Sequence, residues 1–161
     1  MLVSIVIPCY NSEHTIGKVV ELAIEEFEKL KDYECEFVLV NDYSRDGTWN
    51  AIHALAEKHP NVKGINLAKN FGQHNAIMAA MNHTEGDLII GMDDDMQNHP
   101  SQIPLFLDKI QEGYDIVFGV FKERKFSAFK NLTGAVSRFL LWHLLDRPKD
   151  IQMSKIGRAH V

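Results

Sequence analysis

Short apolar runs alternate with segments of helical period along most of this chain. Five runs have the length and composition of β-strands, and they are Val3 to Ile7, Phe37 to Val40, Val62 to Leu67, Leu88 to Met92 and Ile116 to Val120. The runs are mostly apolar throughout rather than alternating, which is typical of parallel strands covered on both faces. The pattern predicts an α/β fold with an open, Rossmann-like, doubly wound and mostly parallel sheet.

Between these runs lie segments whose apolar positions recur with a helical period. Four helices are predicted, over residues 12–31, 46–59, 72–82 and 101–111. A further helix is predicted from Phe126 to Leu145. Its apolar side either packs on the core or lies at a membrane surface.

A polar segment follows each of the first four predicted strands. The segments are residues 8–12, 41–48, 68–72 and 93–97. Ligands of open parallel sheets bind in the crevice at the carboxyl ends of the strands. We therefore expect these four segments to meet at one edge of the sheet and to form the functional site.

The last of these segments is acidic and has the spacing of a cation site. Asp93 and Asp95 are two residues apart and directly follow an apolar strand, with Asp94 between them. Carboxylates so placed can converge on Mg²⁺ or Mn²⁺, which prefer oxygen ligands and bridge to phosphates. The alternative interpretation is a solvated acidic turn that caps the next helix.

Other residues of the same edge are candidates for nucleotide binding. Asp42 can accept hydrogen bonds from a base or a ribose, and Tyr10 and Asn11 can form the wall of a base pocket. Lys69 and Arg124 are the cations best placed to meet phosphates, although a lone basic residue in a loop is usually only solvated.

Composition narrows the choice of partner and compartment. The 161 residues are 45% hydrophobic and 24% charged, which fits one soluble α/β domain, and the net charge of −5 gives no reason to expect nucleic acid. The two cysteines lie in strand-like segments, and no signal peptide is recognisable. The longest apolar stretch near the end, Phe139 to Trp142, is too short to span a bilayer. We expect a cytoplasmic protein.

Four motifs in order carry a family resemblance. They are Ser4 to Asn11, Val40 to Thr48, Asn70 to Gly72 and Met92 to Pro100. Together they resemble glycosyltransferase family 2, which has the GT-A fold, over residues 2 to about 154. The Asp-x-Asp-x-Gln-x-x-Pro pattern is similar to the polyprenyl-phosphate branch, which includes dolichol-phosphate mannose synthase and undecaprenyl-phosphate sugar transferases.

The resemblance implies roles for individual residues of this chain. It assigns the nucleoside pocket to Pro8, Tyr10, Asn11 and Glu13, with Asp42 at the base. It assigns the divalent cation, Mg²⁺ or Mn²⁺, to Asp93, Asp95 and Gln97, and it leaves Asp94 to contact the ribose or the sugar. Arg124 matches the family's basic loop near the diphosphate and the acceptor phosphate. The usual Val-Asp-Asp-Gly-Ser segment is altered here, at Asn41 and Tyr43.

The reaction implied is transfer of a sugar, with inversion, from a UDP or GDP sugar to a polyprenyl phosphate at the cytoplasmic membrane face. Asp95 and Arg124 are the residues expected to act in the chemistry, in which a metal neutralises charge on the departing nucleoside diphosphate. Two alternatives stay open: a saccharide or protein acceptor, and a nucleotide-sugar-binding fragment without catalysis. A nucleotidyltransferase is disfavoured, because no basic glycine-rich loop follows the first strand.

The end of the chain departs from the resemblance. Residues 156–161 can be encoded by ATC GGA AGA GCA CAC GTC, which resembles a common sequencing adapter. We therefore expect residues 1–154 to form the nucleotide-sugar-binding domain, incomplete at its C-terminus, and residues 155–161 to be a non-native tail. Membrane association is expected of the full-length protein.

Overall fold

Strands and helices alternate regularly in the computed structural model, which describes residues 1–119. In chain order the elements are β1 (Leu2–Cys9), α1 (Ile16–Phe27), β2 (Glu34–Asn41), α2 (Thr48–Lys58), β3 (Val62–Asn66), α3 (Gln73–Met81), β4 (Leu88–Gly91), the 3₁₀ helix η1 (Pro100–Gln102) and α4 (Ile103–Gln111). The predicted alternation of strands and helices is confirmed through β4.

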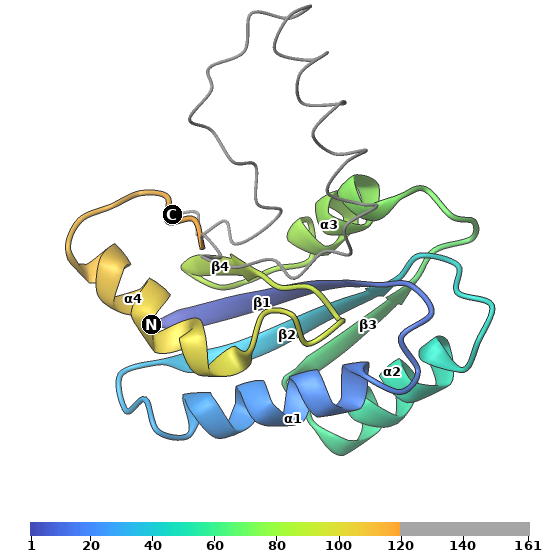
Figure 1. Ribbon diagram of the computed structural model, residues 1–161, viewed down its shortest axis with the longest axis horizontal. Coiled ribbons are helices and arrows are strands. Elements are labelled where there is room, and N and C mark those ends of the chain that lie inside the picture. The colour runs from blue at the N-terminus through green and yellow to red at the C-terminus, as the bar shows by residue number, and fades with distance from the viewer. Residues whose placement is uncertain (120–161) are drawn as a thin grey trace, which may run out of the picture. The chain divides into compact units, whose positions relative to one another are not determined.

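The four strands form one parallel sheet in the order β3-β2-β1-β4 (Figure 1). Ile5 of β1 is paired on one side with Phe37 of β2 and on the other with Ile90 of β4. The chain builds outward from β1 to β3 and then crosses back to place β4 on the far side of β1. The strand order therefore reverses between β1 and β4, where ligands bind in such sheets.

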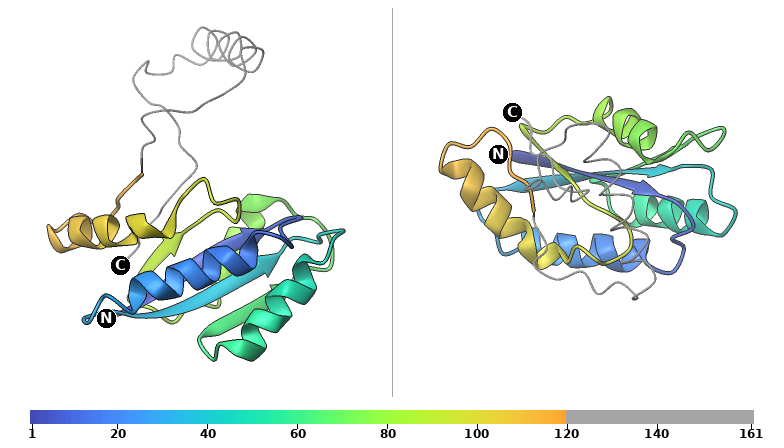
Figure 2. Two further views of the ribbon diagram at one scale, coloured as in Figure 1. Left: turned by 60° about the horizontal axis from the view of Figure 1, so that its bottom comes forward. Right: turned by 45° about the horizontal axis from the view of Figure 1, so that its top comes forward.

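Helices cover both faces of the sheet, as a doubly wound fold requires. One core cluster joins Ile5 and Ile7 of β1 to buried residues of α1, α2 and α4, and the other joins Val6 to Ala76 and Ala80 of α3. Figure 2 shows α1 and α2 side by side across one face and α3 on the other. Each fully buried Val or Ile stabilises the fold by roughly 1.5–3 kcal/mol. Because successive side chains of β1 point to opposite faces of the sheet, this one strand packs against the helices of both layers.

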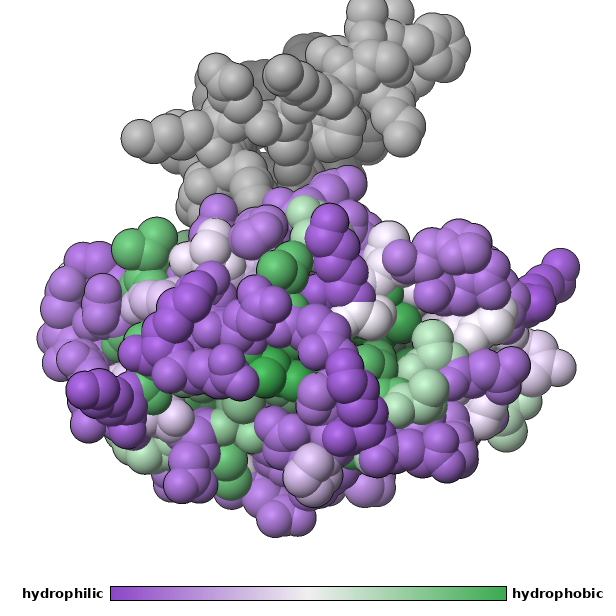
Figure 3. Space-filling view, turned by 90° about the horizontal axis from the view of Figure 1, so that it is seen from below, coloured by the Kyte–Doolittle hydropathy of each residue, from purple (hydrophilic) through white to green (hydrophobic). Residues whose placement is uncertain are grey.

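The outward face of the α1 and α2 layer is mainly hydrophilic, with hydrophobic residues visible between the polar ones (Figure 3). This follows from the apolar stripe of α1, whose buried residues are Ile16, Val19, Val20, Ala23 and Phe27. Within residues 1–119, no helix is both long enough and apolar enough to cross a membrane.

The bounds of α1 and β1 differ from the predicted ones. The first helix starts at Ile16 rather than at residue 12, and it is preceded by a turn in which the Ser12 carbonyl accepts the N–H groups of Thr15 and Ile16. The Ser12 N–H donates to Thr48 Oγ1 at 2.7 Å, which ties that turn to the start of α2. β1 is longer than predicted, since it continues through Pro8 to Cys9.

The predicted fifth strand is wrong over residues 116–119, which form no strand. Apolar composition does not make a strand without a hydrogen-bonding neighbour, and none of the four described strands pairs with this segment. Ile116 and Phe118 are instead 42% and 64% exposed. Arg124, the predicted helix at 126–145 and the predicted tail at 155–161 lie outside the described residues.

Candidate functional site

The loops at the carboxyl edge of the sheet share an unusual backbone feature. Each contains one residue with a positive φ: Asn11 at 54°, Tyr43 at 58°, Gly72 at 86° and Met96 at 62°. A left-handed conformation costs a residue other than glycine about 1–2 kcal/mol. Such strain gathers at functional sites, where the surrounding structure holds it in place. The four polar segments meet as predicted, since hydrogen bonds join the first segment to the second and the fourth, and the second to the third.

Pro8 marks the place where β4 leaves β1. The carbonyls of Leu2 and Val6 accept N–H groups of the segment containing β4, from Asp87 at 2.8 Å and Met92 at 3.0 Å. Alternation along the strand turns Pro8 toward β4 as well, but proline has no N–H to donate. Pairing of β1 with β4 accordingly ends at Val6. The two strands diverge there, which opens the edge at the reversal of strand order.

Asp94 links the two strands across this opening. Its Oδ2 accepts the Tyr10 N–H at 3.0 Å, so the end of β1 is tied to the acidic turn after β4. Burial raises the pKa of the Asp94 carboxyl, the Tyr10 N–H acts in the opposite direction, and the nearby charge of Asp95 raises it further. Within residues 1–119, no lysine or arginine forms an ion pair with Asp94 or Asp95.

Two side-chain amides that are not among the predicted site residues donate hydrogen bonds to Asp93. Gln73 Nε2 donates to Asp93 Oδ1 at 2.8 Å, and Asn98 Nδ2 donates to Oδ2 at 3.3 Å. Gln73 is the first residue of α3, and Asn98 lies in the turn after the acidic segment. The only sequence signal for Gln73 was its place directly after the Asn-Phe-Gly motif.

The remaining predicted cation ligands, Asp95 and Gln97, are exposed, and Asp95 Oδ1 accepts the Gln97 N–H at 2.9 Å. Among the described residues, no three His, Cys, Asp or Glu side chains form a metal cage. Two carboxylates and an amide oxygen are nevertheless a donor set suited to Mg²⁺ or Mn²⁺, which complete their shells with phosphates and water. The residues present therefore fit a cation that binds together with a diphosphate.

Asp42 organises the loop after β3. It is only 4% exposed, and its two oxygens accept the N–H groups of Phe71 at 2.7 Å and Gly72 at 2.8 Å. These bonds fix the turn that leads into α3 and hence the position of Gln73. The family resemblance assigns Asp42 to the base, and the structure adds this second role. A carboxylate oxygen has two lone pairs, so both roles are compatible.

The predicted pocket residues Asn11 and Glu13 tie the first loop to the second. Asn11 Oδ1 accepts the Arg45 N–H at 3.0 Å, and Glu13 Oε2 accepts the Gly47 N–H. A Cβ at position 47 would collide with that carboxylate oxygen, so glycine permits the close approach. The two predicted residues do lie at the site, where they hold its loops together.

Exposed aromatic rings stand at three of the strand ends. Tyr10, Tyr43 and Phe71 are 50%, 54% and 45% exposed. Lys69, predicted to meet phosphates, has its Nζ 4.9 Å from the centre of the Phe71 ring. A ring face can stack on a base, so this edge offers flat apolar surfaces beside its acidic turn.

The cysteines are poorly suited to be nucleophiles. Burial raises the pKa of the Cys9 thiol well above its usual value and that of Cys35 to about 11. Both are free thiols, and they stay protonated at neutral pH.

Comparisons with known proteins agree with this geometry. Residues 4–153 match the model of glycosyl transferase family 2. An undecaprenyl-phosphate 4-deoxy-4-formamido-L-arabinose transferase of Shewanella sediminis is 41% identical over 157 residues, which are 96% of this chain and 46% of that protein. A bactoprenol glucosyl transferase of Shigella phage SfX is 39% identical over 124 residues, which are 77% of this chain and 40% of that protein.

Solved structures support the same fold. Glucosyl-3-phosphoglycerate synthase of Mycobacterium tuberculosis superposes with a TM-score of 0.66 at 22% identity, over 98% of this chain and 54% of that one. A mannosyltransferase of Pyrobaculum calidifontis, in complex with GDP-Man and Mn²⁺, has a TM-score of 0.51 at 28% identity, over 58% of this chain and 27% of that one. The predicted GT-A fold is confirmed. The chain spans less than half the length of the curated relatives it matches, and it belongs to glycosyl transferase family 2.

Proposed function

We propose that this chain carries the nucleotide-sugar site of an inverting glycosyltransferase whose acceptor is a polyprenyl phosphate. The observation that carries the proposal is the acidic turn from Asp93 to Gln97, which lies where the strand order reverses between β1 and β4. The relatives named for undecaprenyl phosphate and bactoprenol support this acceptor class.

A divalent cation is part of the proposal. Asp93, Asp95 and Gln97 are its ligands in this account, and a bound Mg²⁺ or Mn²⁺ supplies charge neutralisation on the departing diphosphate. The relative solved with GDP-Man and Mn²⁺ supports such a cation. Within residues 1–119, no lysine or arginine forms an ion pair with Asp94 or Asp95, and adjacent carboxylates favour a cation as their counter-charge.

The nucleoside occupies the part of the edge beside β1 and β2 in this proposal. Tyr10 offers an exposed ring, Pro8 and Asn11 lie at the end of β1, and Asp42 and Glu13 supply carboxylates. Lys69 approaches the phosphates if it leaves the Phe71 ring, and Asp94 faces the ribose or the sugar. UDP and GDP are both compatible with these groups.

Arg124 completes the chemistry in this proposal, as the cation near the diphosphate and the acceptor phosphate. The acceptor phosphate is already an anion, so its attack on the sugar requires no strong general base. Because the acceptor is a lipid, we place the full-length protein at the cytoplasmic face of the membrane.

The test uses the full-length protein, radiolabelled UDP and GDP sugars, and three acceptors: undecaprenyl phosphate, an oligosaccharide and a peptide. Metal-dependent label in the lipid fraction is the expected result. Label only in the saccharide or peptide would contradict the lipid-phosphate acceptor. Nucleotide binding without transfer to any acceptor would leave only a binding module.

A further inference from the structure

We infer that Gln73 and Asn98 are positioning residues, which orient the Asp93 carboxylate for a divalent cation. The inference rests on the proposed function, since it concerns the same cation. Neither residue belongs to the predicted cation ligands. Both reach Asp93 from other segments: Gln73 from the start of α3, and Asn98 from the turn before η1.

A series of hydrogen bonds positions Gln73 beside Asp93. Buried Asp42 binds the N–H groups of Phe71 and Gly72, and Gly72 has the positive φ that turns the backbone into α3. The next residue is Gln73, whose amide meets Asp93 Oδ1 at 2.8 Å. The position of Gln73 is thus fixed by a buried carboxylate at the end of the neighbouring strand.

The orientation of the Asn98 amide toward Asp93 leaves its own oxygen without a described hydrogen-bond partner. Its side chain is nearly inaccessible, with the residue 6% exposed, and its Oδ1 is buried without a hydrogen-bond partner in the described part of the chain. An orphaned buried acceptor costs about 1–3 kcal/mol. Turning the amide over would place Oδ1 against the Asp93 carboxylate, where two acceptors repel each other. The orientation therefore serves Asp93 at the expense of the amide's own solvation.

The chemical type of the two donors matters. An amide fixes the direction of a carboxylate without adding a positive charge, whereas a lysine would neutralise it. The Gln73 and Asn98 amides hold both oxygens of Asp93 without adding a positive charge themselves. Groups that orient a metal ligand from behind typically change metal affinity by roughly 10- to 100-fold when they are removed.

The test compares Gln73→Met and Asn98→Leu with Gln111→Met in the intact chain. Gln111 donates to Tyr33 Oη at 2.7 Å, just before the start of β2. The control thus loses a similar hydrogen bond at the opposite edge of the sheet. Mn²⁺ binding is measured by electron paramagnetic resonance, with Mn²⁺ alone and with Mn²⁺ plus UDP or GDP. Thermal unfolding and nucleotide affinity are measured in EDTA.

We expect Gln73→Met and Asn98→Leu to weaken Mn²⁺ binding by roughly 10- to 100-fold, with nucleotide affinity in EDTA unchanged, and Gln111→Met to bind as the unchanged chain does. Wild-type Mn²⁺ affinity in a folded Gln73→Met variant would overturn the inference, even if Asn98→Leu fails to fold. Equal losses of nucleotide affinity in EDTA would also overturn it, because they indicate general disruption. No Mn²⁺ binding by the unchanged chain would instead contradict the proposed function itself.

Discussion

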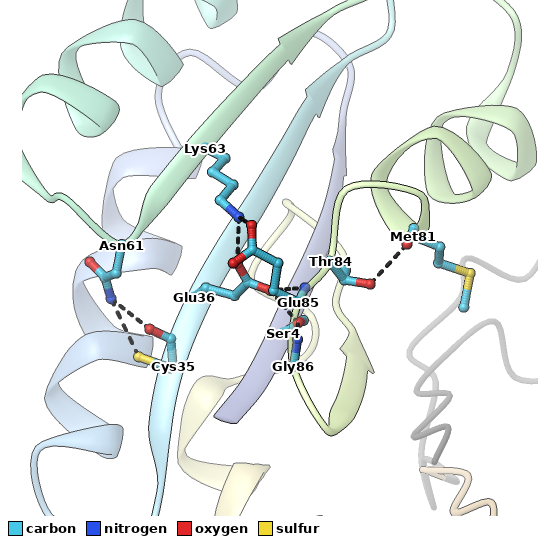
Figure 4. A network of polar contacts seen from close by, with 9 residues as sticks. All are labelled: Ser4, Cys35, Glu36, Asn61, Lys63, Met81, Thr84, Glu85 and Gly86. Atoms are coloured by element: carbon cyan, nitrogen blue, oxygen red, sulfur yellow. Dashed lines mark hydrogen bonds and ion pairs between the residues drawn. The ribbon is translucent and has the colours of Figure 1, made fainter. Parts of the chain in front are cut away.

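Glu36 near the amino edge of the sheet and Asp94 near its carboxyl edge have opposite electrostatic surroundings. Near the amino edge, buried Glu36 accepts a hydrogen bond from Ser4 Oγ at 2.6 Å and pairs with Lys63 Nζ at 3.0 Å (Figure 4). Lys63 also pairs with Glu85 at 2.7 Å. At the carboxyl edge, Asp94 has the Tyr10 backbone N–H and no ion pair with a described lysine or arginine.

The pKa values of the Glu36 and Asp94 carboxyls shift in opposite directions. Burial raises the pKa of Glu36, but the hydrogen bonds from Ser4 and the Glu85 N–H, together with Lys63, leave it below its usual range. Burial and the charge of Asp95 leave the pKa of Asp94 above its usual range. The amino edge neutralises its acid internally and stabilises the fold. Among residues 1–119, Asp94 has no basic partner that would do the same.

Removing Asp95, a predicted cation ligand, should weaken metal-dependent nucleotide binding with little effect on the stability of the fold. Asp95→Ala is expected to weaken Mn²⁺-dependent binding of a nucleoside diphosphate by about 100-fold or more, which is near 2.7 kcal/mol. Because Asp95 is exposed, the unfolding temperature in EDTA should change little. Calorimetry measures the affinity, with exposed Asp108→Ala as control. Unchanged affinity in the Asp95 variant would contradict its assignment as a ligand.

Removing the acid of the amino edge should have the reverse effect. Glu36→Ala deletes the partner of Ser4, Lys63 and the Glu85 N–H, and it is expected to lower the free energy of unfolding by about 2 kcal/mol. Urea titration measures this loss, and Mn²⁺ affinity should stay within about twofold. Glu57→Ala is the control, since Glu57 is exposed and contacts only His53 among the ion pairs of the described residues. Equal stability of both variants would refute the role of Glu36.

The stability of the fold should depend on pH through Glu36. Glu36 has a lowered pKa in the folded chain, so it contributes stability above the unfolded value of about 4.3. That contribution is lost as pH falls through the folded pKa. Glu36→Gln should therefore show a shallower loss of unfolding free energy between pH 5 and pH 3, measured by urea titration at each pH. An acid limb as steep as that of the unchanged chain would count against the Glu36 network.

The smallest expected effect concerns the strained backbone of the carboxyl edge. Tyr43→Gly should raise the free energy of unfolding by about 0.5 kcal/mol, because glycine removes the left-handed penalty but loses more backbone entropy on folding. Thermal unfolding in EDTA measures it, with exposed Tyr114→Gly as control. A clear loss of stability on the Tyr43 change would show that the ring packs in the folded state.

The sequence predicts the strands and the edge at which the polar segments meet, because local patterns of residues determine both. Apolar runs located the four strands, and the polar segments after them met at one edge, as parallel strands require. The hydrogen bonds from Gln73 and Asn98 to Asp93 could not be predicted, because only the tertiary fold brings these three residues together. The segment at 116–119 was misread because pairing, unlike apolar composition, depends on a neighbour. Asp42 was read as a ligand group, while its bonds to Phe71 and Gly72 are tertiary contacts.

A cation and diphosphate site at the carboxyl edge is tested by calorimetric titration of the unchanged chain with UDP and with GDP, each in Mn²⁺ and in EDTA at equal ionic strength. We expect at least one nucleotide to bind, with an affinity that falls by about tenfold or more when Mn²⁺ is removed. Equal affinity in Mn²⁺ and EDTA, or no binding of either nucleotide, would contradict a cation and diphosphate site at the carboxyl edge.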